Sequence, residues 1–223
     1  MLPYLFLLRR NMKKAIERGI KAVVFDYGGV IELTPGSGGG VLRAIAASLS
    51  VPFETFQKEY FKRNHLSKVG NISWDDVLLQ VVAVFDDRKE AGDRALSILE
   101  DFRSRLQINE ELVSLFPILR QQGFKVGIFS NYRESLRGRL QEQGILDQID
   151  EVVVSGEIGF QKPQKEAFDA LFKILKVLPE EVVFIDDTPK SLETANEIGY
   201  IPILFRDNAQ LFGELQKLGI TVE

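Results

Sequence analysis

Short apolar runs that stop abruptly on polar residues recur along this chain. The runs are Ala22–Phe25, Lys125–Phe129, Glu151–Val154 and Val182–Ile185, and the residues that follow them are Asp26, Ser130-Asn131, Ser155-Gly156 and Asp186-Asp187. Continuous apolar runs of this length are typical of strands that are buried on both faces, as in a parallel sheet covered by helices. The pattern therefore predicts buried strands whose carboxyl ends carry polar side chains.

Helical patterns lie between these runs. Helices are expected at Tyr132–Gln143, Pro163–Lys176 and Pro189–Ile198, and a further strand at Ile201–Phe205. Glycine directly follows the first and third helices, and proline begins the second and third, as is common at helix ends and helix starts. The alternation of strands and helices predicts an α/β fold with a doubly wound, Rossmann-like parallel sheet.

One long segment, residues 33–124, departs from this alternation, because a parallel crossover needs only a dozen or so residues. The segment opens with the glycine-rich stretch Pro35–Gly40 and then shows helical patterns at Val41–Leu49, Phe53–Lys62, Ser73–Phe85 and Arg88–Leu106. The Ser73–Asp76 stretch reads as a capping box. We interpret residues 35–107 as an inserted α-helical cap domain set over the active end of the sheet.

The remaining residues complete the predicted domain organisation. A helix at Asn109–Gln122 should rejoin the core, with a kink or a break at Pro117. The Rossmann-like core then comprises residues 21–34 and 108–223, and residues 1–20 form an N-terminal extension. We expect this extension to pack on the body as a short amphipathic segment, unless translation begins at Met12. Its apolar stretch, Met1–Leu8, is too short to span a bilayer, so no membrane partner is expected.

Composition and charge narrow the classes of function. The chain has 28 Lys and Arg against 32 Asp and Glu, and this acidic balance without a basic run argues against a nucleic-acid partner. With no cysteine and a single histidine, His65, it has no thiol nucleophile and no Cys or His metal cluster. A divalent cation would have to be held by oxygen atoms, which favours Mg²⁺. The absence of cysteine also fits a cytoplasmic location.

The polar residues at the strand ends are the candidate functional residues, because ligands bind at the carboxyl ends of the strands in such sheets. The candidates are Asp26, Gly28, Gly29, Ser130, Asn131, Lys162, Asp186 and Asp187. Each has an ordinary explanation as a turn, a helix cap or a surface charge. Their occurrence together at successive strand ends supplies a nucleophile, acids for a cation, a lysine and glycine amides that can approach an anion.

The same residues carry a family resemblance. The segments Val24–Ile31 (VFDYGGVI), Phe129–Asn131 (FSN), Gly159–Pro163 (GFQKP) and Val183–Asp187 (VFIDD) resemble the four motifs of the haloacid dehalogenase superfamily of hydrolases. The likeness covers the core, and the insertion has the position of that family's helical cap. The resemblance implies a phosphatase that acts on a small phosphorylated metabolite, sugar phosphates included.

The resemblance also implies a role for each residue. Asp26 would attack phosphorus and form an aspartyl-phosphate, and Lys162 would neutralise charge between Asp26 and the phosphate. The implied phosphate-binding residues are Ser130, the amide of Asn131 and Lys162, beside the amides of Gly28 and Gly29. The implied Mg²⁺ ligands are Asp26, the carbonyl of Gly28, Asp187 and, directly or through water, Asp186.

The chain departs from the family's phosphatases two residues after the nucleophile. They carry a second aspartate there as general acid, and this chain carries Gly28. General acid–base help is typically worth about a hundredfold to ten-thousandfold. Glu32, His65 or solvent could replace it, the substrate could have a good leaving group, or the chain could be a phosphate-binding module without turnover. A metal-independent 2-haloacid dehalogenase is a further alternative, although adjacent acids at the last motif favour phosphoryl transfer.

Overall fold

The computed structural model describes residues 19–33, 40–68 and 72–222. The chain divides into two compact units, one made of the described residues up to Glu32 and from Ile108 onward, the other of the described residues between Leu33 and Gln107. Each unit has its own apolar core. The predicted extension falls almost wholly on residues 1–18, outside the described residues. In the described part, no helix is both long and apolar enough to cross a membrane.

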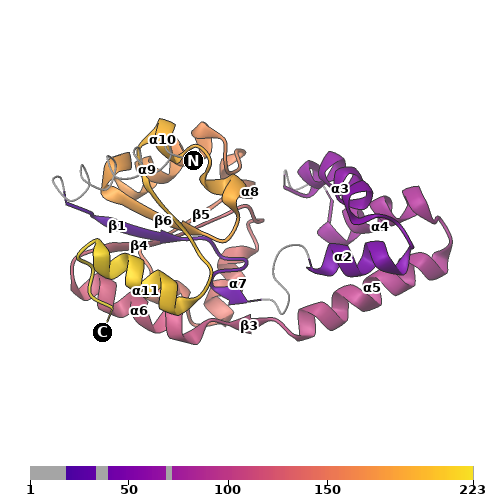
Figure 1. Cartoon of the computed structure of the whole chain (residues 1–223), viewed down its shortest axis with the longest axis horizontal. Helices are drawn as coiled ribbons and strands as arrows, with labels where there is room; N and C mark the ends of the chain where they lie inside the picture. Colours follow the sequence, from indigo (N-terminus) through magenta and orange to yellow (C-terminus); the bar gives the residue numbers. More distant parts are fainter. Residues whose placement is uncertain (1–18, 34–39, 69–71, 223) are drawn as a thin grey trace. The chain divides into compact units, whose positions relative to one another are not determined.

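The first unit is built on a five-stranded parallel sheet. Its strands are β1 (Ala22–Phe25), β4 (Lys125–Ser130), β5 (Glu151–Val154), β6 (Val182–Asp186) and β7 (Ile201–Leu204), in the order β5-β4-β1-β6-β7. The central strand β1 is buried at every position, as its unbroken apolar run predicts. Figure 1 shows helices on both faces of this sheet. The predicted α/β fold with a doubly wound parallel sheet is therefore confirmed.

Helices of unequal length cover the sheet. They are α6 (Glu110–Gln121), α7 (Leu136–Glu142), α8 (Ser155–Ile158), α9 (Lys165–Leu175), α10 (Ala195–Ile198) and α11 (Asn208–Lys217), with 3₁₀ turns η1 (Leu146–Gln148), η2 (Pro179–Glu181) and η3 (Pro189–Leu192). The apolar face of α9, which includes Phe168 and Leu171, is buried in the core. Figure 1 shows α9 and α10 on one side of the sheet and α6 and α11 on the other.

Several predicted helix boundaries are wrong. The helix α7 begins at Leu136 instead of Tyr132, because the Tyr132 carbonyl accepts hydrogen bonds from Gly156 N at 3.0 Å and from Ser155 Oγ at 3.1 Å. This carbonyl is therefore not available to a helical turn. The helix α9 begins at Lys165 instead of Pro163, because Gln164 keeps an extended backbone as its N-cap.

Two predictions about proline also need correction. The expected helix Pro189–Ile198 is divided into η3 and α10, since short helices of this length depend on tertiary packing more than on local pattern. Of the kink or break expected at Pro117, the break is wrong, because α6 continues through Pro117 to Gln121, and the kink stays a prediction. Five buried apolar residues hold α6 on the sheet: Leu112, Val113, Leu115, Phe116 and Leu119.

The second unit is helical. Its helices are α2 (Gly40–Ser48), α3 (Phe53–Lys68), α4 (Trp74–Phe85) and α5 (Lys89–Ser104). The capping box at Ser73 is confirmed, because Ser73 Oγ accepts from Asp76 N and Asp76 Oδ2 accepts from Ser73 N. Two short strands, β2 (Glu32–Leu33) and β3 (Gln107–Ile108), pair where the chain leaves and re-enters the first unit. The placement of this unit over the active end of the sheet stays a prediction.

Candidate active site

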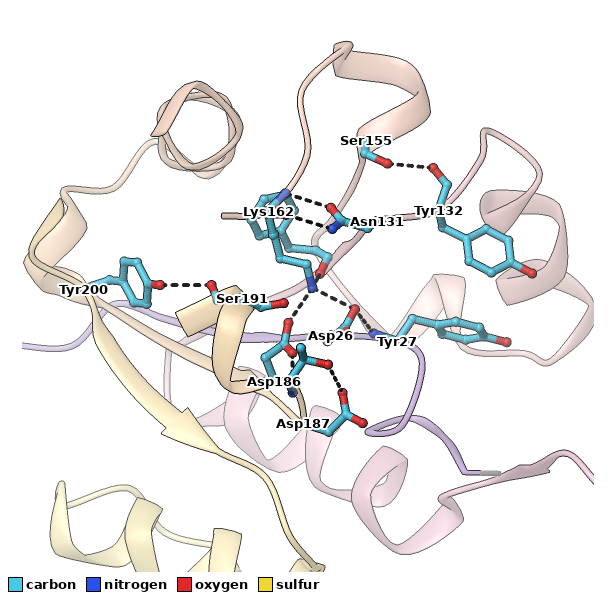
Figure 2. A network of polar contacts seen from close by, with 12 residues as sticks. Asp26, Tyr27, Asn131, Tyr132, Ser155, Lys162, Asp186, Asp187, Ser191 and Tyr200 are labelled. Atoms are coloured by element: carbon cyan, nitrogen blue, oxygen red, sulfur yellow. Dashed lines mark hydrogen bonds and ion pairs between the residues drawn. The ribbon is translucent and has the colours of Figure 1, made fainter. Parts of the chain in front are cut away.

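Three neighbouring strands bring the candidate residues together. The strands β4, β1 and β6 lie side by side and parallel, so Ser130, Asp26 and Asp186 reach the same edge of the sheet. Lys162 comes from the loop between α8 and α9, and Asp187 directly follows β6. Figure 2 shows the side chains of Asp26, Lys162 and Asp186 converging, with Asp187 beside them. We call Asp26, Lys162, Asp186 and Asp187 the site cluster.

The ammonium group of Lys162 is at the centre of the site cluster. Its Nζ lies 2.9 Å from Asp26 Oδ1, 2.6 Å from Asp186 Oδ2 and 3.0 Å from the Phe129 carbonyl oxygen. The side chain is only 1% exposed, so all three ammonium donors have protein partners. Burial by itself lowers the pKa of Lys162, but the carboxylates of Asp26 and Asp186 outweigh burial and raise this pKa above its ordinary value. Lys162 is therefore a fixed positive charge.

The carboxylates of the site cluster outnumber its single cation. One oxygen from each of Asp26, Asp186 and Asp187 lies within 4.8 Å of the others. Burial and the charge of Asp26 raise the pKa of Asp186 to about 7, and the same two causes raise the pKa of Asp187. Crowded like charges of this kind favour a bound cation, and three carboxylates offer the oxygen donors that Mg²⁺ takes. The residues present fit a hard divalent cation.

The two glycines after Tyr27, Gly28 and Gly29, differ in how much space surrounds the position of a Cβ atom. Gly29 has φ +82°, which L side chains rarely adopt, and a Cβ built on it would lie 2.2 Å from Asp187 Oδ2, so a side chain here would strain the backbone and displace the Asp187 carboxylate. A Cβ on Gly28 meets no atom within 4 Å. The main chain thus comes close to the acid at Gly29, whereas the missing side chain at Gly28 leaves open space in the loop.

Asn131 contacts Lys162 by its side chain. Asn131 Oδ1 accepts from Lys162 N at 2.8 Å, and Asn131 Nδ2 donates to the Lys162 carbonyl at 3.1 Å (Figure 2). Both ends of the carboxamide are used to hold the main chain of Lys162. An anion could therefore be held only by the backbone amide of Asn131, and Ser130 lies beside it, 4% exposed, at the end of β4.

Two further residues, Thr188 and Tyr27, donate hydrogen bonds to the acids of the site cluster, and the sequence did not identify them. Thr188 N donates to Asp186 Oδ1 at 2.8 Å, and Thr188 Oγ1 donates to Asp187 Oδ1 at 3.1 Å. The backbone N–H of Tyr27 donates to Asp26 Oδ1 at 2.7 Å. The available signal was position, because Thr188 directly follows the paired acids and Tyr27 directly follows the candidate nucleophile.

Glu32 and His65 are candidate replacements for the missing general acid, and the structure describes the side chain of Glu32 only. Glu32 Oε1 accepts from the Tyr27 hydroxyl at 2.8 Å, and Glu32 also pairs with Arg139. Both contacts tie the Glu32 carboxylate to side chains that lie outside the site cluster. His65 belongs to α3, and its side chain lies outside the described residues.

Sequence comparisons identify related proteins. A model of haloacid dehalogenase-like hydrolases matches residues 20–199. The chain is 27% identical over 223 residues to bifunctional epoxide hydrolase 2 of Rattus norvegicus, an alignment that covers 89% of this chain and 39% of that protein. It therefore spans about two fifths of the length of this relative. It is also 24% identical to D-ribitol-5-phosphate phosphatase of Bacteroides thetaiotaomicron, covering 81% of this chain and 89% of the relative.

A solved structure has the same fold. The HAD family enzyme bt-2542 of Bacteroides thetaiotaomicron matches with a TM-score of 0.62 and 21% identity, covering 87% of this chain and 98% of that chain. A likeness at this level of identity supports the arrangement of strands and helices, and the residues of the site have to be judged from their own geometry.

Proposed function

The chain belongs to the haloacid dehalogenase-like hydrolase family and is therefore a hydrolase, and from this premise we propose that it is a Mg²⁺-dependent phosphatase acting on a small phosphorylated metabolite. One observation carries the proposal. A fully buried lysine joins the candidate nucleophile Asp26 to Asp186, and a third carboxylate, Asp187, lies close by. Phosphoryl transfer needs this combination of a nucleophile, fixed positive charge and acids for a cation.

The acids differ in how they would serve a cation. Both oxygens of Asp186 accept hydrogen bonds from protein groups, Oδ2 from Lys162 and Oδ1 from Thr188. Asp187 Oδ2 instead faces the main chain at Gly29. As the family resemblance implies, Mg²⁺ would be held by Asp26, Asp187 and the Gly28 carbonyl, with Asp186 contributing directly or through water. The cation would balance the excess negative charge and the charge of the incoming phosphate.

Asp26 is the proposed nucleophile, and its two oxygens have separate tasks. Oδ1 accepts from Lys162 Nζ and from the Tyr27 N–H, so these two donors fix the plane of the carboxylate. Oδ2 would form the new bond to phosphorus while the bond from phosphorus to the leaving oxygen breaks. Water would then attack the aspartyl-phosphate, releasing inorganic phosphate and restoring the carboxylate. Lys162, held by Asn131, would stabilise negative charge in both steps.

The leaving oxygen must obtain a proton, and Gly28 cannot donate one. The Glu32 carboxylate is already engaged by Tyr27 and Arg139, so the described residues offer no side chain that we would assign to this role. We propose that water protonates the leaving oxygen and that substrates with acidic leaving groups, such as acyl phosphates and anomeric sugar phosphates, react fastest. The similarity to a D-ribitol-5-phosphate phosphatase adds polyol phosphates to the first compounds to test.

The test is a phosphate-release assay with Mg²⁺ over acyl, sugar and polyol phosphates. We expect turnover that EDTA abolishes and that Asp26→Asn removes. The assay includes 2-chloropropionate with detection of chloride. Chloride release that survives EDTA would replace the proposal with a dehalogenase. Phosphate binding without release in the presence of Mg²⁺ would replace it with a binding module.

A further inference from the structure

A second polar cluster, centred on a buried tyrosine, adjoins the site cluster through the residue that follows Asp26. This Tyr27 cluster consists of Tyr27, Glu32, Arg139 and Gln143. The Tyr27 hydroxyl donates to Glu32 Oε1 at 2.8 Å and accepts from Arg139 Nε at 2.8 Å and from Gln143 Nε2 at 3.0 Å. Burial and the Glu32 carboxylate raise the pKa of Tyr27 above its ordinary value, so the phenol keeps its proton. The proposed reaction uses none of these side-chain contacts.

Tyr27 is the side chain that anchors the turn after the nucleophile. The next two residues are glycines, so between Asp26 and Val30 no other side chain is available to hold the turn. The ring of Tyr27 is fully buried, and Figure 2 shows it pointing away from Lys162. Its main chain is fixed as well, because Tyr27 O accepts from Ile31 N at 2.9 Å and from Glu32 N at 2.8 Å, while Tyr27 N donates to Asp26 Oδ1.

The helix α7 holds the other end of this anchor. Arg139 lies in the last turn of α7 and Gln143 is its C-cap, and both donate to the phenol oxygen. The connection that leads from β4 into α7 also contains Asn131, whose side chain holds the main chain of Lys162. One segment of the chain thus positions both Lys162 and the residue next to Asp26.

We propose that Tyr27 is a positioning residue for phosphoryl transfer: its phenol, held by Arg139 and Gln143, fixes the peptide whose N–H keeps Asp26 Oδ1 beside Lys162. This inference rests on the proposed phosphatase activity. Reacting atoms must be held in near-attack geometry, and a shift of about 1 Å from a change far from the chemistry can cost a hundredfold in rate. The phenol touches neither substrate nor metal in this proposal, so it acts only through Asp26.

The test compares the same substitution at two fully buried tyrosines. Tyr27→Phe keeps the ring and removes the anchor. Tyr200→Phe is the matched control, because the Tyr200 hydroxyl donates to Ser191 O at 3.4 Å and lies outside the Tyr27 cluster. With Mg²⁺ and the best substrate of the screen, we expect Tyr27→Phe to lower kcat about tenfold with KM within about twofold, and Tyr200→Phe to leave kcat within about twofold.

A double variant separates positioning from a general loss of stability. In Tyr27→Phe/Arg139→Met both changes remove the same anchor, so kcat should fall no further than in the more impaired single variant. Multiplied losses, or equal kcat for Tyr27→Phe and wild type, would overturn the inference. If Tyr27→Phe does not fold, the Arg139→Met variant tests the inference by itself. The Arg139 side chain is 35% exposed, so its loss should be tolerated by the fold. This variant should lower kcat without changing KM. An inactive wild type is a failure of the proposed function itself, and the inference falls with it.

Discussion

The two polar clusters that adjoin at Asp26 differ in charge balance. The Tyr27 cluster pairs one acid, Glu32, with one cation, Arg139, around neutral partners. The site cluster sets three carboxylates against Lys162 alone, and the carboxyl groups of Asp186 and Asp187 have raised pKa values. On the proposed function, a cation and a substrate would complete the unbalanced cluster, whereas the balanced cluster needs neither. The excess of negative charge therefore separates the candidate site from the neighbouring network.

The largest expected effect is on turnover, from Asp26→Asn. The amide cannot form the aspartyl-phosphate, so phosphate release should fall by at least about a thousandfold. The melting temperature should stay the same or rise, because a crowded negative charge is removed while Asp186 still pairs with Lys162. Differential scanning calorimetry beside the phosphate assay checks both parts. A large loss of stability would show that Asp26 stabilises the fold, and would contradict the distinction between the site cluster and the Tyr27 cluster.

The next effect is on stability, from Lys162→Met. The substitution leaves Asp26 and Asp186 buried without their cation, and breaking a buried pair in this way costs about 3–5 kcal/mol. Urea unfolding of the metal-free protein measures the loss. The double variant Lys162→Met/Asp186→Asn removes one of the stranded charges and should recover part of the free energy of unfolding without recovering activity. No recovery would mean that packing of the lysine stem, and not charge, sets the cost.

A smaller effect comes from the glycines beside the nucleophile. Gly28→Asp places a carboxyl group in open space, so it should fold and should raise turnover on alkyl phosphates by about tenfold to a hundredfold. It should raise turnover much less on p-nitrophenyl phosphate, whose leaving group needs no acid. The neighbouring Gly29→Ala is the contrasting variant, because its Cβ would collide with Asp187 at a positive φ. Steady-state kinetics on both substrates decide, and equal gains would indicate that another group already supplies the proton.

The smallest effect is the response of stability to Mg²⁺. A ligand present at about a hundred times its Kd adds about 2.7 kcal/mol to the free energy of unfolding, which corresponds to a rise of about 5–11 °C in the melting temperature of a chain of this size. Asp187→Asn should abolish the rise. Glu32→Gln, a matched change in the Tyr27 cluster, should preserve it. A rise that both variants keep would place the cation elsewhere.

The sequence predicted the architecture well because the fold is encoded in local pattern. The spans of β1 and β5 were predicted residue for residue, and the polar residues after the strands do meet at one edge of the sheet. Helix starts were predicted less well. The start of α7 depends on contacts of the Tyr132 carbonyl with a segment more than twenty residues away, which periodicity cannot report.

The sequence predicted which candidate residues lie close together, but it did not predict their side-chain contacts. The residues expected to meet include Asp26, Lys162 and Asp187, and the structure brings them together. The use of the Asn131 carboxamide to hold Lys162, and the engagement of Glu32 with Arg139, could not be inferred from spacing. These contacts depend on side-chain orientation, which sequence spacing alone does not fix.

By itself, the amino-acid sequence determined the order of strands and helices, the family and the set of strand-end residues, because apolar periodicity and the parallel topology place those residues at one edge. Only the tertiary structure decided which oxygen of Asp26 is held, that a side chain is strained at Gly29 and has open space at Gly28, and that Tyr27 is tied to Gln143, 116 residues away. Such choices arise from close packing between segments distant in the chain, where a shift of less than an ångström exchanges one hydrogen-bond partner for another.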